Sequence, residues 1–346
     1  MMKKTVWQRV CMILCSICLL PGLAACAASS MRAQQARALA DASTPVPKAT
    51  AATPSPTPLP TAAPAPTPYT IVWMSDTQAY ASTYPDVYKS MMQYVADNRD
   101  ALNIVYLLHT GDLINNAYTD HDPRNAKAAF DLLPKDLPIL TVCGNHDYKQ
   151  MKDRKGVLQN VYSPYLDNRF DTNIAPEAEF LDGLCHYALF SAGGKDFLLL
   201  SIAYSKERES VDWANQIAAR YPDRIAILCA HSYLKASGDH SGPGKVLFEG
   251  VVSVSPNIRL VLCGHLPGAA RASRLLDDDG DETPERTVYE LMFNYQHESG
   301  GGGGYLRLLT VDPLTGDVHV STYSPWLDDY NYRERLDEFD MPGLFY

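Results

Sequence analysis

The sequence predicts an α/β fold in which two β-sheets pack between helices. Short apolar runs alternate with stretches of helical spacing, and two turn-rich loops connect apolar runs as hairpins. The chain has 346 residues with 46% hydrophobic content, which excludes an intrinsically disordered protein. Because the first 68 residues lack a core-forming pattern, residues 69–346 are expected to form one large domain.

The domain is predicted to begin with a strand and a helix. The run YTIVWMS at residues 69–75 is rich in strand-forming residues, and Val87, Met91 and Val95 then recur at helical spacing within residues 86–98. Fully apolar strands separated by helices indicate a mostly parallel sheet covered on both faces. The alternation continues with strands over 103–109, 138–143, 224–230 and 257–263 and with helices near 124–133 and 245–254.

Two hairpins interrupt this alternation. Residues 190–194 join the apolar run that ends at Phe190 to a run over 197–203, and residues 314–317 join two runs near the C-terminus. The hairpins suggest a second sheet that contains antiparallel strands, and hence two sheets packed between helices.

The first 25 residues have the pattern of a secretory signal. Basic residues precede an apolar run over residues 10–20, which is too short to span a bilayer comfortably. The tetrad LAAC at residues 23–26 resembles the lipobox of bacterial lipoproteins, in which the cysteine is acylated and becomes the new N-terminus. This resemblance implies a lipoprotein signal peptide over 1–25 and a lipid on Cys26, which would anchor the protein to the outer face of the cytoplasmic membrane at the bacterial cell surface. An ordinary secretory signal is the alternative.

Residues 26–68 are expected to be a Pro/Ala/Thr-rich linker after Cys26. Nine prolines lie between Asp41 and Pro68, with almost no side chain apolar enough to build a core. Such a segment stays extended as a polyproline-like spacer, or serves as a flexible linker without a length requirement.

The cysteines do not predict a disulfide framework. Of the eight cysteines, four lie within the first 26 residues. Cys143, Cys229 and Cys263 each end an apolar run that is expected to be a buried strand, where cysteine behaves as a small hydrophobic residue. We therefore predict buried free thiols.

Polar side chains follow five of the predicted strands. In open α/β sheets, ligands bind at the carboxyl ends of the strands. Carboxylate, amide and imidazole groups are ligands for borderline divalent metals, and glycines beside three of these positions allow close backbone approach. The residues at the five strand ends are Asp76, Asp112, the run Asn145-His146-Asp147, His231 and His265.

The order of these motifs resembles the calcineurin-like metallophosphoesterase superfamily. Its pattern is Asp-x-His, Gly-Asp, Gly-Asn-His-Asp/Glu, a lone His and Gly-His-x-His. The resemblance extends from Val72 to about Pro325, and several stretches in this range look like those of secreted bacterial members. It implies a metallophosphoesterase domain over 69–346 with a four-layer α/β/β/α sandwich of two mixed sheets. It also implies hydrolysis of a phosphomonoester or phosphodiester by hydroxide bound to one or two divalent metal ions, with Mn, Fe or Zn expected.

Carried over to this chain, the resemblance implies two metal sites that share Asp112 as a bridge. One site has every ligand in place. The same resemblance gives His146 the role of stabilising or protonating the leaving oxygen, with Asp147 as an orienting partner. The ligands of the complete site are Asp112, Asn145, His231 and His265.

The second implied site is incomplete. It would take Asp76 and two histidines, but Gln78 and Pro267 stand at the histidine positions. Gln78 offers a carbonyl oxygen, which is a harder and weaker ligand, and Pro267 offers only its backbone carbonyl. This site is expected to bind metal less tightly, to favour a hard ion such as Ca or Mg, or to borrow His240 or His297 from a loop.

The function classes that remain are an enzyme and a binding protein. The net charge of −10 argues against nucleic acid as a partner, because such binding depends on basic side chains that neutralise phosphates. The expected substrate is a phosphate-ester small molecule or a cell-surface phosphate ester. Because Gln78 and Pro267 weaken one site, a catalytically weakened surface binding protein on the same scaffold is the alternative.

Two weaker features have ordinary explanations. Arg271 and Arg274 follow the last motif and could contact a substrate phosphate, although surface ion pairs explain them equally well. The acidic stretch at residues 277–282 does not fit an EF-hand and is expected to be a solvated hairpin tip.

Overall fold

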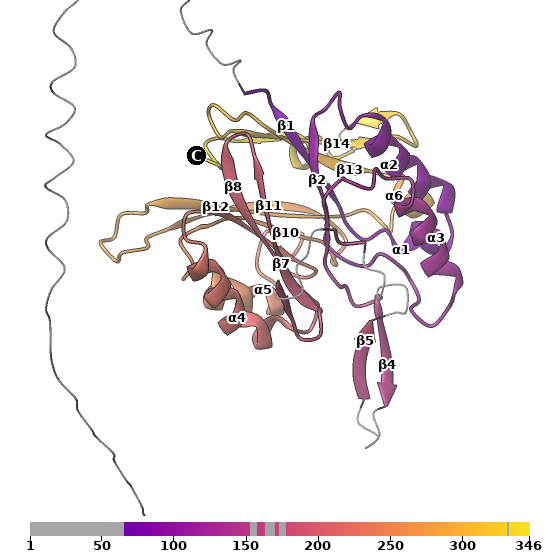
Figure 1. The fold of residues 1–346 in the computed structure, drawn as a ribbon, viewed down its shortest axis with the longest axis horizontal. Coiled ribbons are helices and arrows are strands. Elements are labelled where there is room, and N and C mark those ends of the chain that lie inside the picture. The colour runs from indigo at the N-terminus through magenta and orange to yellow at the C-terminus, as the bar shows by residue number, and fades with distance from the viewer. Residues whose placement is uncertain (1–65, 153–157, 163–169, 173–177, 331) are drawn as a thin grey trace, which may run out of the picture. The chain divides into compact units, whose positions relative to one another are not determined.

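The computed structural model describes residues 66–152, 158–162, 170–172, 178–330 and 332–346, without the side chains of residues 150–152 and 158–162. The predictions on the signal peptide, on Cys26 and on most of the linker lie outside these residues. The described elements belong to one compact unit over Ala63–Tyr346 (Figure 1). Among the described residues, no helix has the length and apolar character needed to cross a bilayer.

The first sheet is mixed. Its strands β1 (Tyr69–Met74), β2 (Ile104–His109) and β3 (Ile139–Thr141) run parallel to one another. On the other side of β1 the sheet continues with antiparallel strands, in the order β15-β14-β13-β1-β2-β3, with β16 also paired to β14. These strands are β13 (Leu306–Val311), β14 (Val318–Ser324), β15 (Asp329–Tyr330) and β16 (Phe339–Met341).

The second sheet is mixed as well. Its strand order is β11-β12-β10-β9-β8-β7-β6, in which β8, β9, β10 and β12 are parallel and both edges are antiparallel. The strands are β6 (Glu179–Phe180), β7 (Cys185–Ala192), β8 (Lys195–Ile202), β9 (Ile225–Ala230), β10 (Ile258–Cys263), β11 (Gly268–Leu276) and β12 (Arg286–Asn294). A separate hairpin is formed by β4 (Tyr148–Lys152) and β5 (Leu158–Tyr162).

Helices cover the outer face of each sheet, as Figure 1 shows. The first sheet is covered by α1 (Gln78–Ser82), α2 (Pro85–Asp97) and α3 (His121–Phe130). The second sheet is covered by α4 (Glu207–Arg220) and by α5 (Gly242–Leu247), which continues into a π-helical turn over Phe248–Val252. Two short helices, α6 (Ser299–Gly302) and α7 (Glu334–Asp337), lie in the C-terminal part.

Three apolar cores hold the four layers together. In β1, Ile71 and Trp73 point into the core between the two sheets, whereas Val72 and Met74 point into the core under α2 and α3. This alternation follows from the two-residue period of a strand, and it explains why β1 is apolar at every position. The third core lies between the second sheet and its helices. The predicted four-layer α/β/β/α sandwich of two mixed sheets is therefore confirmed.

Three details differ from the prediction. The parallel strands do not form one sheet, because β1–β3 belong to the first sheet and β8–β10 to the second. The two predicted hairpins, β7–β8 and β13–β14, exist, but each lies in a different sheet and neither forms a sheet of its own. The helix α4 was not predicted, although Ala214, Ile217 and Ala218 recur at helical spacing on its buried face.

Candidate metal centre

The carboxyl ends of strands from both sheets meet at one place. Asp76, Asp112 and Asn145 follow β1, β2 and β3 of the first sheet, and His231 and His265 follow β9 and β10 of the second. The backbone N–H of His265 donates to the carboxylate of Asp76 at 3.0 Å, so this contact joins the two sheets. The sequence prediction that these strand ends lie together agrees with this arrangement.

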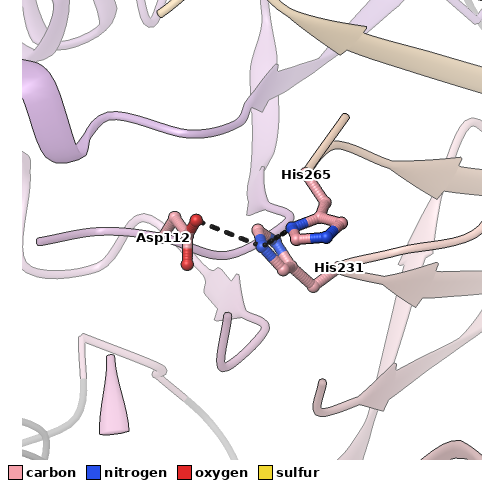
Figure 2. Close-up of side chains that lie close together, drawn as sticks. All are labelled: Asp112, His231 and His265. Atoms are coloured by element: carbon pink, nitrogen blue, oxygen red, sulfur yellow. Dashed lines mark hydrogen bonds and ion pairs between the residues drawn. The ribbon is translucent and has the colours of Figure 1, made fainter. Parts of the chain in front are cut away.

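Three donor atoms of this cluster lie close to a fourth, Nε2 of His231. His231 Nε2 lies 3.0 Å from Asn145 Oδ1, 3.2 Å from Asp112 Oδ2 and 3.2 Å from His265 Nδ1. Figure 2 shows the imidazole of His231 between the carboxylate of Asp112 and the ring of His265. The metal-binding atoms of these three side chains lie within 4.8 Å of one another.

The far side of the His231 ring fixes its orientation. Its Nδ1 lies 2.8 Å from the carbonyl oxygen of Thr110, to which the Nδ1–H donates. In the neutral ring this bond places the proton on Nδ1 and leaves the Nε2 lone pair directed at the other three donor atoms. A hydrogen bond from the second ring nitrogen to a carbonyl is the usual support of a metal-binding histidine.

The charges of the cluster favour a cation at its centre. Burial alone would lower the pKa of His231, but the charge and hydrogen bond of Asp112, together with Asp76, raise it to about 10. Burial and the neighbouring His231 lower the pKa of His265 to about 4. Burial opposes ionisation of Asp112, yet His231 holds the pKa of this carboxyl below its usual value. Without metal, a proton on His231 therefore supplies positive charge beside Asp112.

Two glycines make room for the ligands. A Cβ on Gly111, whose φ is +103°, would lie 2.5 Å from Nδ1 of His231, and a Cβ on Gly144 would lie 2.2 Å from Oδ1 of Asp112. Both distances are far below van der Waals contact, so a larger residue would displace a ligand. The predicted close backbone approach at these glycines agrees with the geometry.

The carboxylate of Asp147 binds the backbone of two loops. It is fully buried, and its two oxygens accept N–H groups from Asp112, Leu113, Ile114 and Gly144 at 2.9–3.2 Å. Burial and the charge of Asp112 raise the pKa of Asp147 to about 7, although its N–H partners oppose the rise. Among the described residues, no hydrogen bond joins it to the imidazole of His146, and its role as orienting partner of that ring stays a prediction.

His146 is held from two sides. Its backbone N–H donates to Asp112 Oδ1 at 2.9 Å, and its Nδ1 lies 2.8 Å from the carbonyl oxygen of Asn115. This second contact places a proton on Nδ1 and leaves Nε2 available to another group. The side chain is partly buried, as are Asn145 and His265 of the metal-binding cluster beside it.

The incomplete second site has a different set of contacts. The carboxylate of Asp76 accepts the backbone N–H of His265 and the hydroxyl of Ser75 at 2.6 Å, and burial raises its pKa to about 7. Gln78, the first residue of α1, donates its Nε2–H to Asp112 Oδ2 at 3.2 Å, while its buried Oε1 has no hydrogen-bond partner among the described residues. Pro267 is exposed, directly before β11.

The two histidines considered as borrowed ligands lie elsewhere. His240 Nε2 is 2.9 Å from Glu290 Oε1, which also accepts the hydroxyl of Tyr233, and Arg274 donates to Glu290 Oε2, so this imidazole belongs to a separate network. His297 is exposed. Neither contacts the metal cluster in the described part of the chain.

Sequence reasoning missed two residues beside the centre. His109, the last residue of β2, is buried, and burial lowers its pKa to about 3. It accepts the N–H of Gly111 at Nδ1 and contacts Thr77 Oγ1 through Nε2 at 2.9 Å, so it links two of the strand-end loops. The ring of Tyr204 lies 5.0 Å from that of His265 and 5.8 Å from that of His231. A polar residue inside an otherwise apolar strand was the available signal for His109.

The weaker sequence features have ordinary explanations. Arg274 donates to Glu290 at 3.0 Å, and the guanidinium of Arg271 lies over the ring of Phe339, so each cation has a structural partner. Residues 277–282 lie at the exposed tip between β11 and β12, where their carboxylates accept backbone N–H groups. The prediction of a solvated hairpin tip is in agreement with this. The four described cysteines, Cys143, Cys185, Cys229 and Cys263, are buried and form no disulfide with one another.

Comparison with known proteins assigns the chain to a class. Residues 69–269 match the calcineurin-like phosphoesterases, and the chain belongs to this family of hydrolases that act on phosphoester bonds. The uncharacterized protein YvnB of Bacillus subtilis (strain 168) is 37% identical over 279 residues, which are 79% of this chain and 21% of YvnB. The chain thus matches about a fifth of the length of that relative.

A solved structure shares the fold. Purple acid phosphatase PPD1 from seeds of yellow lupin (Lupinus luteus) superimposes with a TM-score of 0.52 at 13% identity, covering 80% of this chain and 54% of the phosphatase chain. At this identity the likeness concerns the fold alone. Together with the family match, it confirms the resemblance that the motifs predicted.

Proposed function

We propose that this domain hydrolyses phosphoric esters with the help of a divalent metal ion held by four side chains. The observation that carries the proposal is the convergence of an amide oxygen, a carboxylate oxygen and a second imidazole nitrogen within 3.2 Å of His231 Nε2. One carboxylate, one amide and two imidazoles form a donor set for Mn, Fe or Zn. The four ligands are Asp112, Asn145, His231 and His265.

The residues fit such an ion. His231 presents an oriented lone pair, and the absence of side chains at Gly111 and Gly144 leaves space around the donor atoms. A bound divalent ion neutralises phosphate oxygens and lowers the pKa of a water molecule. The protein supplies the charge balance, because ion binding replaces the proton that Asp112 otherwise stabilises on His231.

His146 is the proposed acid of the reaction. Its Nδ1–H donates to the carbonyl of Asn115, which fixes the orientation of the ring. When the imidazole is protonated, its Nε2–H can donate to the leaving oxygen of the ester and protonate it as the bond breaks. The family resemblance supports this role, and the anchoring of the His146 backbone to Asp112 keeps the ring next to the metal ligands. Asp147 then acts by holding these loops in place.

The proposed substrate is a phosphomonoester or phosphodiester at the cell surface or in the surrounding medium. A lipid on Cys26, with residues 26–68 as a linker, would hold the domain outside the cytoplasmic membrane; the LAAC tetrad supports this proposal. Replacement of Cys26 with Ala should abolish incorporation of radiolabelled palmitate and release the protein from the membrane fraction. Unchanged labelling would refute the anchor and leave the proposed activity untouched.

The activity is tested with chromogenic phosphate mono- and diesters. We expect the full chain to hydrolyse at least one of them with Mn, Zn, Fe or Ca, and Asp112→Asn to abolish turnover while the circular dichroism spectrum is retained. The control is Asp239→Asn, which changes an exposed carboxylate away from the metal ligands. Full activity of the Asp112 variant would refute the assignment.

A binding protein on the same scaffold is the second candidate. The exposed Pro267, which has no side-chain donor, and the engaged carboxylate of Asp76 favour it. Metal analysis separates the two candidates. Less than one equivalent of metal together with no hydrolysis would favour binding, whereas one or more equivalents with turnover support the enzyme.

A further inference from the structure

We infer that the centre holds one divalent ion, and that Gln78 occupies the place of a second ion as a hydrogen-bonding group. The inference rests on the proposed metal-dependent function and specifies its cofactor. The donor atoms that converge in this region belong to one group, since among the described side chains only Asp112, His231 and His265 bring carboxylate or imidazole atoms within 4.8 Å of one another here. Asn145 completes this group.

Asp76 is engaged by protein donors. Its carboxylate is 2% exposed and accepts two donors, the hydroxyl of Ser75 and the backbone N–H of His265, which lies 3.2 and 3.0 Å from its two oxygens. Both carboxylate oxygens therefore have a partner within the protein. The group is also packed tightly, since a Cβ on Gly264 would lie 2.0 Å from Asp76 Oδ2. The carboxylate of Asp76 therefore connects the end of β1 to the end of β10 by hydrogen bonding, which is a structural role.

Gln78 directs a donor at the shared ligand. Its Nε2–H donates to Asp112 Oδ2 at 3.2 Å, and this same oxygen lies 3.2 Å from His231 Nε2. A second cation bridged by that oxygen would have to displace the amide hydrogen, which carries a partial positive charge. The neutral amide thus donates a hydrogen bond to the second lone pair of Asp112 Oδ2. The carboxylate can then bind a single ion while this buried oxygen keeps a hydrogen-bond partner.

The remaining donors are weak ligands for a second ion. Pro267 is exposed and contributes no side-chain donor, and His240 is bound to Glu290. Even if Asp76 and Gln78 were freed, a second ion would find no imidazole among its side-chain ligands, because Asp76, Gln78 and the shared Asp112 offer oxygen atoms alone. The neutral amide also adds no charge to offset a further divalent ion.

This arrangement gives Gln78 a positioning role in the proposed reaction. Its Oε1 is buried and lacks a partner among the described residues, so it can accept an O–H from water or substrate beside Asp112. A buried acceptor without a donor is unfavourable, so a ligand that supplies an O–H gains from the contact. The single ion and this carbonyl oxygen would then orient the attacking water from two sides.

Metal stoichiometry of the purified full chain tests the inference. After saturation with Mn²⁺ or Zn²⁺ and removal of excess metal, we expect one equivalent by elemental analysis. The Mn²⁺ form should give the six-line electron paramagnetic resonance spectrum of an isolated ion. Two equivalents with a spin-coupled spectrum would overturn the inference and leave the proposed hydrolysis intact. Less than one equivalent together with no hydrolysis would overturn both.

A variant pair tests the part assigned to Gln78. The double substitution Gln78→His and Pro267→His restores two donors, and we expect the stoichiometry to rise from one to two with appearance of spin coupling. Gln78→Asn with Pro267→Ala is the matched control, which adds no imidazole and should keep one equivalent. If the histidine pair also binds only one ion, the assignment of Gln78 as the group that replaces the second ion is wrong.

Discussion

Replacement of Asp147 by asparagine tests how the metal loops are held together. The carboxylate is fully buried, and each of its oxygens accepts two backbone N–H groups from the loops of Asp112 and Gly144. Asparagine replaces one oxygen by an NH₂ group, which points hydrogens at two of these donors. Two buried N–H groups then lose their acceptor, and at about 1–3 kcal/mol each the free energy of unfolding should fall by about 2–6 kcal/mol.

The substitution should weaken metal binding as well as lower the free energy of unfolding. Because the same loops carry Asp112 and Asn145, we expect Mn²⁺ affinity measured by calorimetry to fall at least tenfold, alongside the loss seen in urea denaturation. Asp122→Asn is the control, since this buried carboxylate accepts one backbone N–H, from Asn116, and the asparagine oxygen can keep it. An Asp147 variant with wild-type stability and metal affinity would refute the reasoning.

Three further predictions follow from the same structure. Gly144→Ala places a Cβ 2.2 Å from the carboxylate of Asp112, so Mn²⁺ affinity should fall at least tenfold, about 1.4 kcal/mol, whereas Gly242→Ala, with no atom within 4 Å, should not change it. Arg307→Leu leaves the buried Asp337 without its ion-pair partner at 2.9 Å and should cost about 3–5 kcal/mol in urea unfolding; a loss below 1 kcal/mol would contradict this. The buried thiols of the domain should not react with Ellman's reagent until the protein is denatured; they are Cys143, Cys185, Cys229 and Cys263. Rapid reaction of the native protein would contradict their burial.

The strand ends were predictable because chemistry and periodicity agree there. A polar residue such as Asp112 or His231 directly after a fully apolar run marks the carboxyl end of a buried strand, and parallel strands bring such ends to one edge. The division of strands between two sheets was not predictable, because it depends on pairings such as β1 with β13, more than two hundred residues apart in sequence. Local patterns carry no information about such partners.

The role of Asp147 was not predictable for a related reason. Its four donors are backbone N–H groups, which are the same at every position of the chain, so no residue pattern identifies them. The contact of Gln78 with Asp112 likewise depends on the direction of α1 after β1. The sequence showed that Gln78 and Pro267 stand where the family pattern has histidines, but not which contacts these two residues make instead.

The backbone at the centre explains why the ligands need such support. Asp76, Asp112 and His265 have φ angles of 52°, 55° and 66°, in the left-handed region that non-glycine residues seldom adopt. Such positions cost of order 1–3 kcal/mol each and persist when the surroundings determine them. Glycine would relieve this strain, but it would remove the carboxylate or imidazole from the site. The N–H groups bound by Asp147 and by Asp76 therefore offset a conformational cost imposed by the placement of metal ligands at the strand ends.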